Sequence, residues 1–106
     1  MNVDPKVLSV TLSEVLTDIV RKNHTVEEIA MSACVVNLLT TTKDQGLRYC
    51  LRNGKSKYLF CGFNMYTYKE WPENIIRVFD QSYRLLALIE INDDGTTTTH
   101  VITDSE

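Results

Sequence analysis

The pair Asn53-Gly54 restricts the fold of this 106-residue chain more than any other feature, because it separates two runs that alternate between apolar and polar residues. Asn and Gly both tolerate positive φ, which the tight turn of a two-residue β-hairpin requires. We therefore expect a hairpin over residues 47–61 with these two residues as its loop. In that register Tyr49 faces Tyr58 across the hairpin.

The same register gathers basic residues on one face of this hairpin. The segment 43–57 contains five basic residues and one acidic residue, a net charge of +4, whereas the whole chain carries -3. This face is interpreted first as a solvated surface that protects the hairpin from aggregation. The alternatives are a docking face for an acidic protein and a ribbon that contacts nucleic-acid phosphates. The residues concerned are Arg48, Arg52, Lys55 and Lys57.

A second hairpin is expected over residues 84–102. The run 84–91 is almost continuously apolar, as is typical of a central strand that is covered on both faces of its sheet. Asp94-Gly95 then supplies another two-residue turn. The threonine-rich segment that follows, residues 96–102, is typical of an edge or outer strand.

Helix signals dominate the first forty residues. Thr11 and Thr25 each stand three residues before a glutamate, the spacing of a capping box at a helix N-terminus. Apolar residues recur after each box at three- and four-residue intervals. Helices are therefore predicted over about 11–22 and 26–39.

Three of these assignments have an alternative. Asp4-Pro5 offers an earlier start for the first helix, because proline suits the first helical position. The β-branched pair Val35-Val36 favours strand, so part of the second helix is extended in the alternative interpretation. Residues 73–83 follow a proline that allows a helix, but their β-branched content favours a strand and a turn.

Together these elements predict an α+β fold. Two N-terminal helices are expected to pack on one face of an antiparallel sheet of about four to five strands built from hairpins. A length of 106 residues, 43% of them hydrophobic, suits one domain over 1–106 with one core. The acidic tail 104–106 is expected to fray.

The expected location is the cytoplasm. The N-terminal residues lack the basic and apolar regions of a signal peptide, and the longest purely apolar stretch, Leu85–Ile89, is far shorter than the ~18–20 residues of a membrane span. Three cysteines, an odd number, suit reduced thiols better than a disulfide framework. No membrane partner is therefore expected.

No catalytic, metal or cofactor site is predicted. The cysteines Cys34, Cys50 and Cys61 lack the close spacing of structural zinc sites. His24 and His100 are interpreted as structural, and His100 falls opposite Ile89 in the predicted second hairpin as a half-buried strand residue. There is no glycine-rich phosphate loop and no nucleophile in a glycine-flanked turn. We therefore expect no cofactor and no enzymatic activity.

An aromatic cluster, Tyr66, Tyr68 and Trp71, lies in a polar context between the hairpins. Tyr and Trp in a loop are common anchors of protein interfaces, and they also stack on nucleic-acid bases. The structural alternative is a lid that closes the open end of the core. The cluster is a candidate interaction surface.

The function predicted by elimination is that of a small cytosolic, non-enzymatic regulator or inhibitor that binds another protein. Stand-alone domains of this size are common among phage and mobile-element proteins that inhibit a host. A homodimer through an exposed sheet edge fits the same facts. The first alternative is a nucleic-acid-binding module that uses the basic hairpin, and the second is a domain that binds a small ligand or nucleotide.

Overall fold

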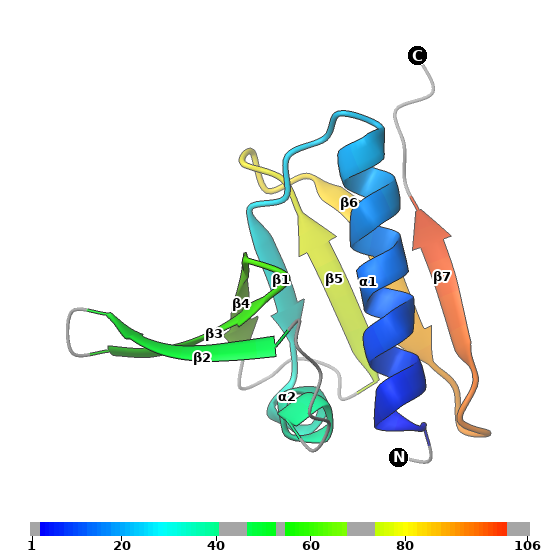
Figure 1. Cartoon of the computed structure of the whole chain (residues 1–106). Helices are drawn as coiled ribbons and strands as arrows, with labels where there is room; N and C mark the ends of the chain where they lie inside the picture. The colour runs from blue at the N-terminus through cyan, green and yellow to red at the C-terminus, as the bar shows by residue number, and fades with distance from the viewer. Residues whose placement is uncertain (1–2, 41–46, 53–54, 68–73, 102–106) are drawn as a thin grey trace.

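Two helices and seven strands make up the described part of the chain, which covers residues 3–40, 47–52, 55–67 and 74–101 of the computed structural model (Figure 1). The architecture is the expected α+β fold with a mostly antiparallel sheet. The elements are α1 (Pro5–Arg21), β1 (Glu28–Met31), α2 (Ala33–Thr40), β2 (Leu47–Arg52), β3 (Lys55–Phe60), β4 (Phe63–Thr67), β5 (Ile75–Phe79), β6 (Leu85–Ile91) and β7 (Thr97–Val101).

The strands form one sheet in the order β2-β3-β4-β1-β5-β6-β7. It has seven strands, more than the four or five predicted. Every neighbouring pair is antiparallel except β1 and β4, which run parallel. The sheet is therefore not built from hairpins alone, because β1 inserts between β4 and β5 from the segment that links the two helices.

The prediction of one helix over 26–39 is wrong. Residues Glu28–Met31 form β1, and all four are buried between the neighbouring strands. Burial on both sides of a central strand overrides the local helical pattern, and the predicted capping box at Thr25 does not form because Glu28 pairs with Phe79. The second helix begins only at Ala33, where the Ser32 hydroxyl accepts the N–H of Val35 at 3.3 Å.

The first helix begins at Pro5 rather than at Thr11, as the earlier-start alternative proposed. Asp4 caps it, and its carboxylate accepts the Lys6 N–H at 2.9 Å. Thr11 lies inside the helix. The helix ends before Asn23, which has a φ of 65° and so reverses the chain in the left-handed region.

The core lies between α1 and one face of the sheet (Figure 1). The sheet contributes fully buried residues, among them Ile29, Ile76 and Ile89. α2 closes one end of this core and contacts α1, rather than lying beside it on the sheet. The buried apolar residues of α1 are Leu8, Leu12, Val15, Leu16 and Ile19, and Ser9 is buried beside them.

The register predicted for the first hairpin is confirmed. β2 pairs with β3 so that Tyr49 lies opposite Tyr58, and Arg52 lies opposite Lys55. The two strands extend away from the rest of the sheet (Figure 1). Residues 75–79 form β5 and are followed by a turn, as the strand interpretation of 73–83 expected.

The second hairpin exists, but its predicted register is wrong by one residue. His100 pairs with Leu88, and Ile89 pairs with Thr99. The loop contains three residues between Asn92 and Thr96, with Gly95 at a φ of 90°, so the pairing shifts relative to a two-residue turn. His100 is consequently exposed instead of half-buried.

Neither of the two described helices is long and apolar enough to serve as a membrane-spanning segment. The predicted frayed tail, residues 104–106, lies outside the described residues.

Candidate functional site

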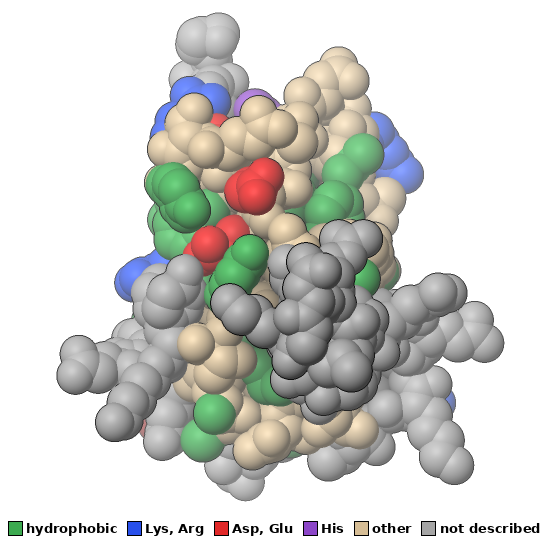
Figure 2. Space-filling view, turned by 90° about the vertical axis from the view of Figure 1, so that its left-hand side faces the viewer, with side chains coloured by type: hydrophobic (Ala, Val, Ile, Leu, Met, Phe, Trp, Pro, Cys, Tyr) green, Lys and Arg blue, Asp and Glu red, His purple; other side chains and the backbone are tan. Residues whose placement is uncertain are grey.

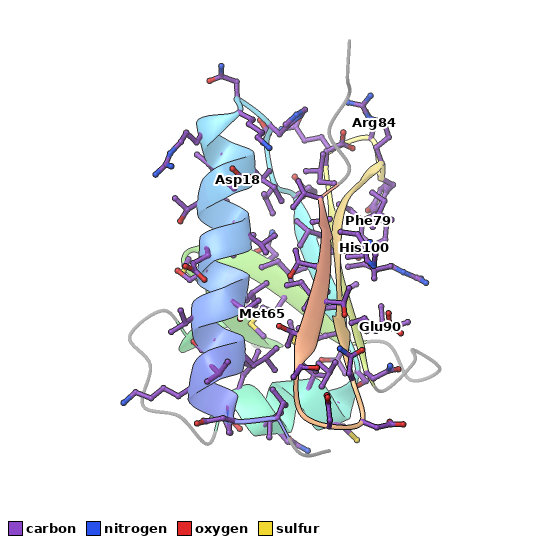
Figure 3. All side chains as sticks on the ribbon, turned by 90° about the vertical axis from the view of Figure 1, so that its right-hand side faces the viewer. Asp18, Met65, Phe79, Arg84, Glu90 and His100 are labelled. Carbon is purple, nitrogen blue, oxygen red and sulfur yellow. The ribbon has the colours of Figure 1, made fainter. Side chains whose placement is uncertain are left out.

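The sheet has a second face, remote from α1, which we call the open face. Among the described residues no helix covers it. Figure 3 shows Phe79, Glu90 and His100 on this side of the strands, whereas Met65 points toward α1. Strand pairing sets a row across it from β4 to β7, made of Tyr66, Ala30, Arg77, Leu88 and His100.

Several apolar residues of the open face are only half-buried. Leu88 lies in its central row, and Ile75 and Phe79 flank Arg77 at two-residue spacing on β5. The apolar run in β6 predicted a strand covered on both faces. In the part of the chain that the structure describes, a helix covers only the face that carries Ile89, and Leu88 on the other face is half-buried.

The turn between β5 and β6 borders the Phe79 end of this face. Asp80 donates its N–H to the carbonyl of Arg84, and Tyr83 donates its N–H to the carbonyl of Asp80, both at 3.0 Å. The Asp80 carboxylate accepts the N–H of Ser82 at 2.8 Å and that of Arg84 at 2.9 Å. These hydrogen bonds, led by that from the Arg84 backbone, hold the pKa of Asp80 below its ordinary value.

Tyr83 occupies a strained position in this turn. The β6–β7 loop has the same pair of backbone hydrogen bonds, from Asn92 to Thr96 and from Gly95 to Asn92. Tyr83 therefore stands where the second loop has Gly95, and both have positive φ, 59° and 90°. A bulky residue with positive φ is uncommon, because its Cβ approaches the following carbonyl oxygen.

Burial of the Tyr83 side chain does not clearly compensate for this strain. The residue is 69% exposed, so about 60 Å² of its surface is removed from water on folding. That area contributes roughly 1.5 kcal/mol at about 25 cal/mol per Å². The left-handed conformation costs a non-glycine residue roughly 1–2 kcal/mol. The two contributions nearly cancel, and the fold gains little from a tyrosine here.

Two hollows lie elsewhere on the described surface. An apolar groove of about 280 Å³ separates α1 from the β3–β4 turn, and the Sγ of Cys61 lies 4.0 Å from the Oγ of Ser13 at its edge. Figure 2 views this side of the molecule and shows hydrophobic side chains at the surface. The groove is lined by Ser13, Leu16, Thr17, Val20, Cys61 and Phe63.

The second hollow, of about 230 Å³, is polar and lies between residues 23–25 and the Asp80–Arg84 turn. The Asp80 carboxylate in it is already engaged by the turn. Within the described ranges, no group of three or more His, Cys, Asp and Glu side chains is arranged to hold a metal ion.

The aromatic cluster predicted from the sequence is only partly described. Tyr66 is 38% exposed and lies in β4, in the row of the open face, rather than in a loop. Tyr68 and Trp71 lie outside the described residues.

The basic contact face predicted from the sequence lies on the β2–β3 hairpin. Arg48 and Arg52 lie in β2, and Lys55 and Lys57 lie in β3, in the expected backbone register. Their side chains lie outside the description.

Tyr83 was not among the predicted site residues. A tyrosine next to a polar segment carries no sequence signal of positive φ, which is usually marked by Gly or Asn. The polar stretch Asp80-Gln81-Ser82 did predict a turn, and the conformation of Tyr83 emerges only from its hydrogen bonds. Comparison with protein-family models, with curated proteins and with solved structures found no match.

Proposed function

We propose that this protein is a cytoplasmic, non-enzymatic regulator or inhibitor that acts by binding another protein through its open face. The observation that carries the proposal is Tyr83, an exposed aromatic residue in a conformation that favours glycine. Strained residues that add little to stability are concentrated at functional sites. A partner that receives the Tyr83 side chain supplies the reason for its presence.

The composition of the surface supports a protein as the ligand. Arg77 and half-buried Leu88 are neighbours on this face, and Tyr66 lies in the same row beyond Ala30. Phe79 lies two residues from Arg77 on β5, and Tyr83 belongs to the turn that follows Phe79. Aromatic residues and arginine are enriched in interface cores and dominate their binding energy. A nucleic acid would instead require several basic side chains on the same surface.

The test is affinity capture from native host extracts with matched variants. Tyr83→Gly removes the side chain and keeps a residue that suits the backbone. Gly95→Ala strains the equivalent position of the other loop and leaves Tyr83 in place. We expect the wild type and Gly95→Ala to capture the same specific partner. Tyr83→Gly should not capture it.

A second control is Val10→Ala on α1, where the wild-type side chain is 53% exposed. This change removes exposed apolar surface from α1, at a site distant from the open face, so the variant should still capture the partner. Equal capture by Tyr83→Gly and the wild type would contradict the proposal, provided that circular dichroism shows both to be folded.

The β2–β3 hairpin supports nucleic-acid binding as a second candidate, because its confirmed register groups the basic positions as predicted. The test is titration of labelled RNA and DNA at low and at physiological salt. Arg52→Glu with Lys55→Glu should abolish binding, while Lys6→Glu with Arg21→Glu on α1 makes the same charge change elsewhere. No binding at low salt, or equal loss in both double variants, excludes this candidate.

A further inference from the structure

The sheet ends in two edge strands that differ in sequence. β2 at one edge contains two arginines, whereas β7, Thr97–Val101, contains no Lys, Arg, Asp, Glu or Pro. Its pairing with β6 is regular and has no bulge. Charges, prolines and bulges are the usual means by which edge strands avoid pairing with another chain. β7 carries none of them.

The hydrogen-bond pattern shows which backbone groups point outward from β7. Asn92 donates its N–H to the carbonyl of Thr96 at 2.8 Å, so this pair is hydrogen-bonded. Hydrogen-bonded pairs alternate with non-bonded ones in an antiparallel ladder. Thr98 and His100 therefore direct their backbone groups to β6. Thr97, Thr99 and Val101 direct theirs to the free edge, where no described strand pairs with them.

Carboxylates lie near the start of this edge strand. Asp93 and Asp94 are exposed in the turn that leads into β7, and Glu90 lies opposite Thr98 on β6. Asp18 lies on the side of α1 that is seen when β7 faces the viewer (Figure 3), although Lys22 pairs with it at 3.0 Å. A second copy of this chain would bring a net charge of -3 to the same edge.

We infer that β7 binds an extended, basic segment of a protein partner, which adds to the sheet as an eighth strand. This inference rests on the proposed function in that the ligand is a protein, but it uses a different surface. The outward groups of Thr97, Thr99 and Val101 provide the backbone hydrogen bonds. The surrounding carboxylates favour Lys and Arg over acidic residues in the segment.

The register supplies a matched test variant. Thr99→Pro removes an outward N–H and leaves the ladder to β6 intact, because proline is tolerated on an edge strand where its missing donor faces solvent. The probe is a fluorescein-labelled heptapeptide in which lysine alternates with valine. Its controls are the same peptide with alternate amides N-methylated and a version with glutamate in place of lysine.

We expect the lysine peptide to bind the wild type and Thr99→Pro to weaken binding by up to about tenfold, the effect of losing one backbone hydrogen bond. N-methylation of alternate amides should weaken binding by more than this, because it removes several donors. The glutamate peptide should not bind. Equal affinity for the methylated and unmethylated lysine peptides would overturn the inference, because attraction would then be electrostatic only. Self-association in sedimentation that Thr99→Pro abolishes would also overturn it, in favour of a second copy.

The two proposals fail separately. If the peptide does not bind but Tyr83→Gly still loses a captured partner, only the edge inference is wrong. If peptide binding depends on Thr99 but the captured partner does not depend on Tyr83, the proposal of an interface on the open face is wrong and the inference about the β7 edge is retained.

Discussion

The strain at Tyr83 predicts that Tyr83→Gly is more stable than Tyr83→Ala, because the two variants differ mainly in how well their backbones adopt positive φ. Tyr83→Gly and Tyr83→Ala both remove the side chain, so the roughly 1.5 kcal/mol of burial is lost from each. In the left-handed conformation, alanine costs roughly 1–2 kcal/mol more than glycine. Glycine loses about 0.4–1 kcal/mol more through the entropy of the unfolded chain. Tyr83→Gly should therefore be more stable than Tyr83→Ala by about 0.8 kcal/mol, the difference between the middles of these two ranges.

The assay is thermal unfolding followed by circular dichroism, with urea unfolding as a second measurement. At about 4–8 °C per kcal/mol for a domain of this size, the melting temperatures should differ by about 3–6 °C. Gly95→Ala, the reciprocal change, should destabilise the wild type by a similar amount. If Tyr83→Ala is as stable as Tyr83→Gly at equal urea m-values, Tyr83 is not strained and the argument for its function fails.

Three further predictions test the fold. Ser32→Ala should lower the free energy of unfolding by about 1 kcal/mol in urea, because the first-turn N–H of α2 loses its acceptor. Thr98→Pro should destabilise by about 1–3 kcal/mol, because this proline removes a ladder hydrogen bond to β6 and leaves its acceptor without a donor. Thr99→Pro should melt close to the wild type, and equal destabilisation by the two prolines would refute the register. The pKa values of Asp80 and Asp94 lie below the ordinary 3.8. Their stabilisation is therefore present above that value and is lost as the pH falls through the lower folded-state values. The urea midpoint should fall below about pH 4, and Asp80→Asn with Asp94→Asn should flatten this decline.

The register of the first hairpin was predictable because a two-residue loop determines which residues pair. The same rule failed in the second hairpin. Gly95 is there the third residue of a three-residue loop, in the left-handed position. A shift of one residue moves a side chain to the other face of the sheet. His100 thus lies beside Leu88 on the open face instead of beside Ile89 under α1.

The central strand was not predictable from local patterns. Thr25 and the glutamate three residues later satisfy the capping-box pattern, and the residues that follow have helical spacing. Only the pairing of Ile29 with Met65 on one side and with Val78 on the other makes this segment a strand. These partners are distant in sequence, so their effect is absent from any local window.

β4 was missed for a different reason. Cys61 and Gly62 both have positive φ, 52° and 86°, and form the two-residue turn between β3 and β4. Gly62 was the available signal. The turn was not predicted, because cysteine is not a usual residue at the first position of such a turn. Tyr66 was consequently assigned to a loop, whereas it lies in β4 and is exposed.

The apolar run of β6 links the sequence to the proposed surfaces. Its local pattern requires cover on both faces, and the described fold supplies cover on one. Such a disagreement between local pattern and fold is expected where a protein binds something else. A strand added at the β7 edge would extend the sheet in its own plane and would leave Leu88 half-buried. The open face and the edge are therefore separate surfaces, and occupation of one does not remove the physical reason for a partner at the other.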